Sequence, residues 1–339
     1  MNTFPSAEYK IIQNIKSVLR ESGTNPRFEH LIGDDAAVRV NQENERLIMT
    51  ADVSVENVHF STSYMDLKEI AYRAMVTNLS DCAAMGATPD SALVQLVFPK
   101  NIQNLDDSIE LIYTGFAQAC KRWGFPIVGG DISCGPAWII AIALTGRVAP
   151  EKRVVKRQTI RPGDSLWITG AAGKSAAGLA ALGRWGRRDV PDLYATYVKA
   201  HISPVPRIEA GQALAADPQV HALMDLSDGL SKDVATLCHD NNIGFLFEKN
   251  VLPVYDTMIQ LADQLGLDWN EWFYHGGEDY ELIVAADTTF DPAQYRDHQV
   301  QFVRLGSFSD EFSGVMVAGP KDTMLPLKCR SYDHCSKDY

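Results

Sequence analysis

The chain has 339 residues, a formal net charge of −12 at pH 7, a hydrophobic fraction of 46% and a charged fraction of 22%. This length exceeds what one typical domain needs and the composition is that of an ordinary globular protein, so we expect two domains. The net negative charge argues against a broad nucleic-acid surface, which requires clustered Lys and Arg, and we expect no nucleic-acid partner. It does not exclude phosphorylated substrates, because bound Mg²⁺ can reverse the local sign of the charge.

Cysteine usage and the amino terminus point to the cytoplasm. The six cysteines form no C-x-x-C pair and show no zinc-ligand spacing, so we interpret them as free thiols in a reducing compartment. The first ten residues lack the apolar core of a signal peptide, and no window reaches the roughly 18 consecutive apolar residues of a membrane span. We therefore expect a cytoplasmic protein with no membrane partner.

In the first half of the chain, helical and alternating apolar spacings predict a mixture of helices and strands. The predicted helices are Ala7–Glu21, with Ser6 as N-cap, then Asp66–Gly86 and Asn104–Trp123. The predicted strands are Arg46–Asp52, Ser91–Phe98, Phe125–Gly130 and Trp138–Leu144. We expect the strand at 125–130 to be short and buried. The strand at 138–144 is almost wholly apolar, which predicts a central strand covered on both faces.

The stretch from Ala149 to Pro162 is polar, basic and bounded by prolines, and we place a domain boundary there, giving domains 1–150 and 151–339. In the second half, the predicted strands are Ser165–Thr169, Ala222–Met224, Ile243–Phe247, Tyr280–Ala285, Gln301–Leu305 and Gly314–Val317. The predicted helices are Ala176–Leu182, Pro204–Ala216, Leu230–Asn241 and Tyr255–Leu265. This mixture predicts a layered α/β or α+β fold.

Two segments of the second half suggest ligand binding, but a structural role is the better interpretation of each. Gly170-Ala-Ala-Gly-Lys-Ser175 is close to a P-loop, yet Ile168 stands where a Walker A motif requires glycine. A close-packed strand-to-helix turn explains it better, although the amides at the helix start could bind an anion. The aromatic run at 268–274 could form a lid over a ring-bearing ligand, but core packing is the safer interpretation.

Acidic residues recur at the ends of apolar runs, beside glycine or another small residue, and their mutual repulsion suggests a metal site. These residues are Asp34, Asp52, Asp81, Asp131, Asp225 and Asp228. Any one of them is weak evidence, because Asp is common in turns, and a helix-end or salt-bridged Asp81 would be equally ordinary. Together they would destabilise the fold unless cations lay among them. Hard oxygen ligands in this arrangement predict a site for several Mg²⁺ ions and the phosphates that they carry.

Other chemistries find no matching motif. The histidines form no H-E-x-x-H spacing, there is no G-x-S-x-G elbow for acyl transfer, and the carboxylates have no sugar-cleaving context. The remaining interpretation is Mg²⁺-dependent phosphoryl transfer, in which an enzyme positions phosphates and neutralises their charge.

Eight motifs together resemble the thiamine-monophosphate kinase family, in that family's order and over nearly the whole chain. They are Gly33-Asp-Asp-Ala-Ala, Thr50-Ala-Asp52, Asn57-Val-His59-Phe60, Asn78-Leu-Ser-Asp-Cys-Ala-Ala-Met-Gly-Ala87, Gly129-Gly-Asp131, Leu144-Thr-Gly-Arg147, Asp225-Leu-Ser-Asp-Gly-Leu230 and Gly277-Glu-Asp-Tyr-Glu-Leu282. The resemblance implies a two-domain aminoimidazole ribonucleotide synthetase-like fold, with an N-terminal sheet domain that forms a homodimer and a C-terminal α/β domain that completes the active site. It also implies Mg²⁺-assisted in-line transfer from ATP to thiamine monophosphate, giving thiamine diphosphate.

The resemblance also implies roles for individual residues. The Mg²⁺ ligands would be Asp34, Thr50, Ala51 through its carbonyl, Asp52, Asp81, Asp131, Asp225 and Asp228. The ATP contacts would be Tyr113, Gly130, Asp131, Arg147 and Ser227, and the thiamine monophosphate contacts His59, Glu278 and Tyr332. Asp52, Asp131, Asp225 and Arg147 would act in catalysis.

The sequence departs from the family pattern in places, and alternatives remain. Ile132-Ser133-Cys134 replaces a Thr-rich run, and Lys174 stands where a small or acidic residue is usual. A selenophosphate synthetase would be expected to carry a reactive Cys in its amino-terminal segment, and a hydrogenase maturation protein one at its extreme carboxyl end. A catalytically silent nucleotide-binding regulator is the third alternative, although such a relative would be expected to lose some of the acids.

Overall fold

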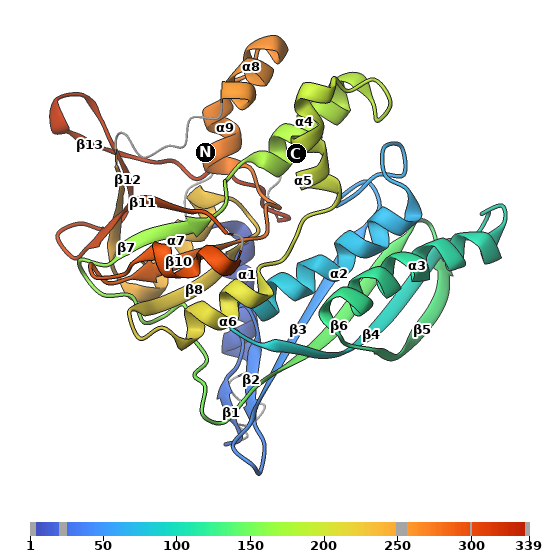
Figure 1. The fold of residues 1–339 in the computed structure, drawn as a ribbon, viewed down its shortest axis with the longest axis horizontal. Coiled ribbons are helices and arrows are strands. Elements are labelled where there is room, and N and C mark those ends of the chain that lie inside the picture. The colour runs from blue at the N-terminus through green and yellow to red at the C-terminus, as the bar shows by residue number, and fades with distance from the viewer. Residues whose placement is uncertain (1–4, 20–25, 249–255, 299, 336–339) are drawn as a thin grey trace.

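The computed structural model describes residues 5–19, 26–248, 256–298 and 300–335, and its strands form two sheets (Figure 1). The first sheet has the order β1-β2-β3-β6-β4-β5 and consists of β1 (Phe28–His30), β2 (Ala37–Val40), β3 (Arg46–Val55), β4 (Thr88–Pro99), β5 (Ile127–Gly135) and β6 (Ile139–Val148). The second has the order β13-β12-β9-β11-β7-β10-β8 and consists of β7 (Ser165–Thr169), β8 (Val220–Leu226), β9 (Gly244–Phe247), β10 (Glu281–Ala286), β11 (Phe302–Ser309), β12 (Gly314–Ala318) and β13 (Met324–Pro326). The layered mixed fold is therefore confirmed, whereas the domain boundary at residue 150 stays a prediction.

Helices pack on and between these sheets. They are α1 (Ala7–Leu19), α2 (Leu67–Ala84), α3 (Leu105–Trp123), α4 (Lys174–Trp185), α5 (Ala195–Ile202), α6 (Ile208–Ala216), α7 (Leu230–Asn241), α8 (Asp256–Leu265) and α9 (Trp269–His275). The patterns did not predict α5 or α9, which are both short. In α9 Trp272 and Phe273 are buried, so the core interpretation of the aromatic run is confirmed.

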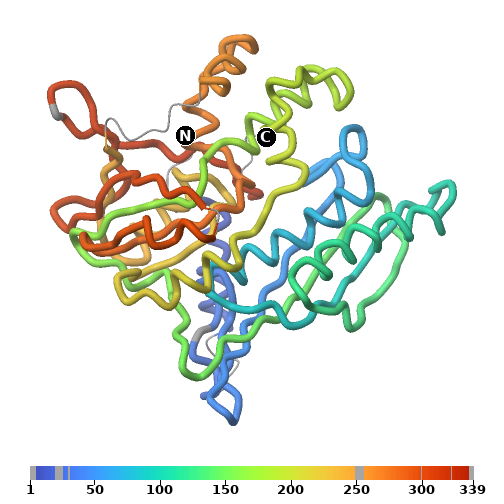
Figure 2. Tube along the Cα trace, viewed as in Figure 1, coloured from blue at the N-terminus to red at the C-terminus, as the bar shows by residue number. Residues whose placement is uncertain are grey.

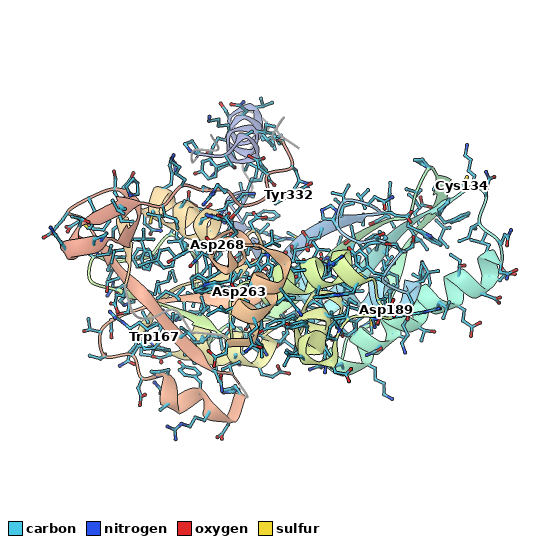
Figure 3. The ribbon with its side chains drawn as sticks, turned by 90° about the horizontal axis from the view of Figure 1, so that it is seen from above. Cys134, Trp167, Asp189, Asp263, Asp268 and Tyr332 are labelled. Carbon is cyan, nitrogen blue, oxygen red and sulfur yellow. The ribbon has the colours of Figure 1, made fainter. Side chains whose placement is uncertain are left out.

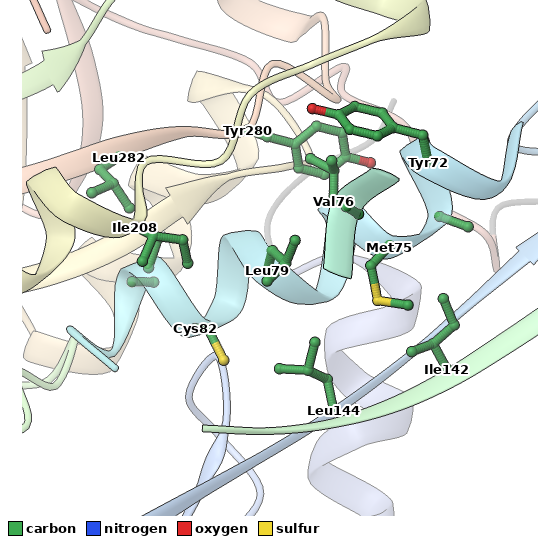
Figure 4. Packing of buried hydrophobic residues seen from close by; sticks show 14 of the residues in the cluster. Tyr72, Met75, Val76, Leu79, Cys82, Ile142, Leu144, Ile208, Tyr280 and Leu282 are labelled. Carbon is green, nitrogen blue, oxygen red and sulfur yellow. The ribbon is translucent and has the colours of Figure 1, made fainter. Parts of the chain in front are cut away.

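Helix α2 is the central element of the molecule. Asp66 begins it with a reciprocal capping box: its side chain accepts from the Glu69 amide, and the Glu69 side chain accepts from the Asp66 amide. Burial extends around most of the helix because it lies between the two halves. Figure 4 shows Leu79 and Cys82 of α2 between Leu144 of β6 on one side and Ile208 of α6 on the other. An apolar helix in this position brings both halves against one core.

Only one face of the first sheet is covered by α2 and α3 (Figure 1). Strand β6 is central, between β3 and β4, but its burial alternates along the strand. For the single chain the expectation of a strand covered on both faces was therefore wrong, because the described helices pack against one side. The expectation of a short buried strand at 125–130 was also wrong: β5 is a nine-residue edge strand, and Val128 and Ile132 on it are 61% and 55% exposed.

The first helix and the connection between the sheets both contact the C-terminal half. Figure 3 shows α1 standing out from the body near Tyr332, and the Ala7 amide donates to Asp333 at 2.8 Å. The Ser6 hydroxyl accepts from the Tyr9 amide, as its predicted capping role requires, while residues 20 and 21 of the predicted helix lie outside the described residues. The connection after β6 runs below the molecule to β7 (Figure 2). No helix in the described ranges is long and apolar enough to cross a bilayer.

Candidate active site

A cavity of about 490 Å³ opens between the two halves and is lined by residues of both. Strand β3 contributes Asp52, and α2 contributes Arg73, Thr77 and Asp81. The opposite side is lined by Asp225 near the end of β8, by Ser227 and Asp228 in the loop between β8 and α7, and by Gly277 and Glu278 in the loop before β10. The segment after β13 adds Tyr332 and His334.

On the N-terminal side, the facing surfaces of β3 and α2 place their acids together. Thr50 and Asp52 lie two residues apart on β3 and therefore point to the same face, toward α2. The Thr50 hydroxyl donates to the Asp81 carboxylate. A carboxylate within the apolar stripe of a buried helix needs a polar partner, and the Thr50 hydroxyl of β3 is that partner for Asp81.

On the C-terminal side, Asp225 ends β8 and Asp228 lies in the turn that follows. The Ser80 hydroxyl on α2 donates to Asp225 at 2.7 Å, which joins the two halves directly. Lys232 Nζ lies 2.9 Å from the Asp228 carboxylate and 2.7 Å from Glu8 of α1. Acids from both halves therefore share one site, as the sequence predicted.

Burial and mutual repulsion raise the pKa values of these acids. Burial, and then Asp52 and Asp228, raise the pKa of Asp225 to about 7 against the hydrogen bond from Ser80. Burial, followed by Asp52 and Asp225, raises the pKa of Asp81 well above its usual value. Burial and Asp34 do the same to the pKa of Asp35, against the attraction of Arg157. These acids therefore favour the binding of protons or cations at this site.

The donor set fits Mg²⁺ that keeps water or phosphate among its ligands. Hard carboxylate oxygens converge here, and Asp35 Oδ2 is buried with no hydrogen-bond partner in the described structure. Within the described ranges, no three His, Cys, Asp or Glu side chains lie close enough to form a ready-made metal cage. Mg²⁺ bound through one or two carboxylates each, with substrate oxygens completing the shell, suits such a site.

The substrate side of the cavity carries the predicted His59, Glu278 and Tyr332. The His59 ring lies 5.0 Å from the His334 ring, and the Tyr332 ring stands edge-on to His334 at 4.7 Å. Burial, and then His334, lower the pKa of His59. Burial opposes the ionisation of Glu278, but Arg73 and His201 outweigh it, so the pKa of Glu278 lies below its usual value.

The P-loop-like turn is occupied by the protein's own carboxylate. Asp279 accepts hydrogen bonds from the amides of Gly173 and Ser175 at 2.6 and 2.8 Å. Gly173 has φ +83°, and a Cβ there would lie 2.7 Å from the Trp272 backbone. The interpretation as a close-packed turn is confirmed, and these two amides bind an internal anion.

Several predicted residues lie away from the acids. Residues paired across a sheet share a face, so Val53, Ala141, Gln95 and Asp131 form one row on the face opposite to Asp52. Three strand spacings separate β3 from β5, roughly 14 Å. Arg147 also lies on that face, and its Nε pairs with Asp90 at 2.8 Å. Ala51 was predicted to act through its backbone carbonyl and lies between Thr50 and Asp52 on β3, so the direction of its side chain does not test that prediction.

Two further predicted nucleotide residues, Gly130 and Tyr113, are also outside the cavity lining, whereas Ser227 is part of it. Gly130 lies on β5 beside Val94, and a Cβ at Gly130 would approach the Val94 carbonyl oxygen to 1.8 Å. Tyr113 lies on α3, where its ring is 5.5 Å from that of Phe116. Asp34 adjoins the acids, and its carboxylate accepts from the Arg157 amide at 3.4 Å.

The sequence reasoning missed residues that the fold brings to the site. They are Arg73, His201, Lys232 and Asp233. Asp35 belonged to the predicted acidic motif at Gly33 but was assigned no ligand role. A signal existed for Arg73, because a charged residue within the buried stripe of α2 needs a partner. No local signal marked Lys232 or Asp233, since α7 reads as an ordinary helix.

Comparison with known proteins agrees with this geometry. Residues 33–148 match the family model "AIR synthase related protein, N-terminal domain", and residues 161–300 match the corresponding C-terminal domain model. The thiamine-monophosphate kinase of Synechococcus elongatus is 34% identical over 263 residues, covering 74% of this chain and 76% of that protein. The Bacillus subtilis enzyme of the same name is 30% identical, covering 74% of this chain and 75% of its own length.

Solved structures give the same result. The structure of AaThiL complexed with AMPPCP and TMP has a TM-score of 0.83 and 27% identity, and the match covers 96% of each chain. A hydrogenase maturation protein, HypE, has a TM-score of 0.66 at 19% identity over 92% of this chain and 95% of its own, which shows the shared fold alone. The chain therefore belongs to the thiamine-monophosphate kinase family.

Proposed function

We propose that the protein transfers the terminal phosphoryl group of ATP to thiamine monophosphate, giving thiamine diphosphate and ADP. The observation that carries this proposal is the convergence of acids from both halves on one cavity whose other wall bears His59 and Glu278. Family membership and the similar chain that binds AMPPCP and TMP support it. The hydrogenase maturation alternative has support at the level of the fold only.

The proposed Mg²⁺ ligands are Asp34, Thr50, Ala51, Asp52, Asp81, Asp131, Asp225 and Asp228. Of these, Asp131 lies on the opposite face of the sheet, so its role requires a nucleotide that extends to that face. Bound Mg²⁺ would neutralise and align the phosphates for in-line transfer. The acids would hold the Mg²⁺ ions at a fixed place between the halves, and the phosphates of both substrates would bind there through the metal. The acceptor is a phosphate oxygen that is already ionised near neutral pH, so no strong general base is required.

His59, Glu278 and Tyr332 are the proposed contacts of thiamine monophosphate. The ionised Glu278 carboxylate suits a cationic or hydrogen-bond-donating group on the substrate. Tyr332 is 42% exposed at the cavity, so its ring face is accessible for stacking on a substrate ring.

The proposed ATP contacts are Tyr113, Gly130, Asp131, Arg147 and Ser227. Ser227 lines the cavity. Asp131 and Arg147 lie on the exposed sheet face, so their roles require a ligand or a second copy of the chain on that face.

A homodimer through this exposed face is part of the proposal. Leu93 and Val53 on it are 42% and 49% exposed, and a second copy would remove them from water. Leu93→Lys should then give a monomer in sedimentation at concentrations where the wild type is a dimer. A monomeric wild type would contradict this part of the proposal.

We also propose a cytoplasmic location, because six unpaired thiols are typical of a reducing compartment.

Incubation of the purified protein with ATP, Mg²⁺ and thiamine monophosphate tests the activity. We expect thiamine diphosphate and ADP in equal amounts, and no product when unphosphorylated thiamine replaces the monophosphate or when EDTA removes the metal. If the rate of ATP hydrolysis is the same with and without thiamine monophosphate, and no thiamine diphosphate forms, the proposal is refuted and another member of the superfamily is favoured. Binding of ATP without turnover would favour a silent regulator.

A further inference from the structure

Arg73 is a buried cation at the junction of the two halves. It lies on α2 and is 2% exposed. Its Nη1 donates to the carbonyl of His59 at 2.6 Å, and its Nε donates to the carbonyl of His201 at 2.9 Å. Its Nη2 lies 2.5 Å from the Glu278 carboxylate. One side chain therefore binds the loop after β3, the end of α5 and the loop before β10.

Such a group is not explained by stability alone. Removing a guanidinium from water costs several kcal/mol, and a buried ion pair is often no more stabilising than apolar residues of similar volume. Arginine does offer a planar fork with five donors, which can bind a carboxylate and two carbonyls at once in fixed directions. The value of Arg73 thus lies in the geometry that it imposes on its three partners.

The backbone around Glu278 shows how tightly this geometry is set. Glu278 and Tyr280 have φ values of +67° and +52°, a left-handed conformation that residues with a side chain rarely adopt. The Glu278 amide donates to the Ser227 carbonyl at 2.7 Å, and the Tyr280 amide donates to the Leu226 carbonyl at 2.9 Å. Strain of this kind persists only where the surroundings determine the conformation. Arg73 holds the side chain of Glu278 while these bonds hold its backbone.

We propose that Arg73 is a positioning residue for thiamine monophosphate, which fixes the separation of His59 and Glu278 across the cavity. The inference rests on the function proposed above and on the assignment of those two residues to the substrate. His59 belongs to the N-terminal half, and Glu278 to the C-terminal half. Without Arg73 the two sides of the substrate subsite are no longer held by a common group, and substrate binding weakens. ATP binding depends on other residues and should change little.

The experiment compares Arg73→Met, Arg73→Lys and a control, Arg153→Met, in the full chain. Arg153 also donates to backbone carbonyls, those of Ala215 and Val220 at 2.8 and 2.6 Å, but away from the cavity. We expect Arg73→Met to raise the KM for thiamine monophosphate at least about tenfold and the KM for ATP less than about twofold. Lysine keeps the charge but loses the fork, so Arg73→Lys should restore only part of the affinity. Arg153→Met should lower Tm with both KM values unchanged.

Arg73→Met leaves the half-buried Glu278 carboxylate without its cationic partner, so this variant could fail to fold. The double variant Arg73→Met/Glu278→Gln removes that uncompensated charge. We expect it to recover thermal stability, and we expect its KM for thiamine monophosphate to exceed that of the single variant Glu278→Gln, which lacks the same carboxylate but keeps Arg73.

Three results would overturn the inference: full rescue by lysine, equal increases in both KM values, or a KM for thiamine monophosphate in the double variant equal to that of Glu278→Gln alone. A wild-type protein without kinase activity would instead refute the proposed function, so the two failures are distinguishable.

Discussion

Replacing Asp225 by Asn should stabilise the metal-free protein at alkaline pH. The side chain is 3% exposed, and burial followed by the neighbouring acids raises its pKa from 3.8 to about 7. Because the folded state binds the proton more tightly than the unfolded state, ionisation destabilises the fold. The destabilisation is absent below about pH 4, grows as pH rises and is complete above about pH 7. At 1.36 kcal/mol per pKa unit, the gap between 3.8 and 7 corresponds to about 4 kcal/mol.

Asn removes the charge and keeps an oxygen that can accept the hydrogen bond from Ser80. An unfolding entropy of about 2.1 cal/mol/K per residue converts 4 kcal/mol into a Tm increase of roughly 5 °C at pH 8. At pH 5 the increase should be less than half of that. Scanning calorimetry in EDTA at the two pH values measures both numbers. Added Mg²⁺ should raise the Tm of wild type more than that of the variant, because ligand binding to the folded state stabilises it.

Asp164→Asn is the control for this prediction. Asp164 is also buried, but His221 Nδ1 lies 2.9 Å from its carboxylate, which accepts from the Arg161 amide at 2.8 Å. Its replacement weakens a satisfied network, so Tm should fall at both pH values. The reasoning about Asp225 is refuted if Asp225→Asn melts below wild type at pH 8 in EDTA, or if its gain is the same at pH 5 and pH 8.

Three further changes test the site and the packing around it. Asp52→Asn should lower kcat at least about 100-fold without lowering Tm, because it removes a ligand for the charge that aligns the phosphates; wild-type turnover in a thiamine diphosphate assay would count against the metal-ligand assignment. Arg147→Gln should raise the KM for ATP while the KM for thiamine monophosphate stays constant, and an unchanged KM for ATP would remove Arg147 from the nucleotide site. Gly178→Val should destabilise by about 3 kcal/mol or more, since a Cβ at Gly178 would lie 2.1 Å from the Tyr197 carbonyl oxygen; a Tm equal to wild type would show that α4 and α5 can separate without loss.

Local patterns in the sequence predicted most of the elements and the core of the site. The apolar stripe of α2, the strand that leads to Asp52 and the turn after β8 each carry their own signal, because periodicity and turn chemistry act over a few residues. Acids at the ends of apolar runs were expected to share a metal site, and Asp52, Asp81 and Asp225 do line one cavity. The physical basis of that expectation is that several acids repel one another unless cations lie among them.

The tertiary structure decided which faces of the helices and strands are covered and by which neighbours. Periodicity tells which residues share a face, but it does not tell whether a helix, water or another chain covers that face. The alternation of β6 and the exposure of β5 follow from the one-sided packing of α2 and α3. The strand order and register place Asp131 on the opposite face of the sheet from Asp52. The sequence analysis assigned no role to Arg73. Its partners His59, His201 and Glu278 are brought to it only by the fold, from as far as 205 positions along the chain. Helix, strand and turn signals depend on neighbouring residues, so the sequence shows them directly. The contacts of Arg73 form only when segments that are distant in the sequence pack together.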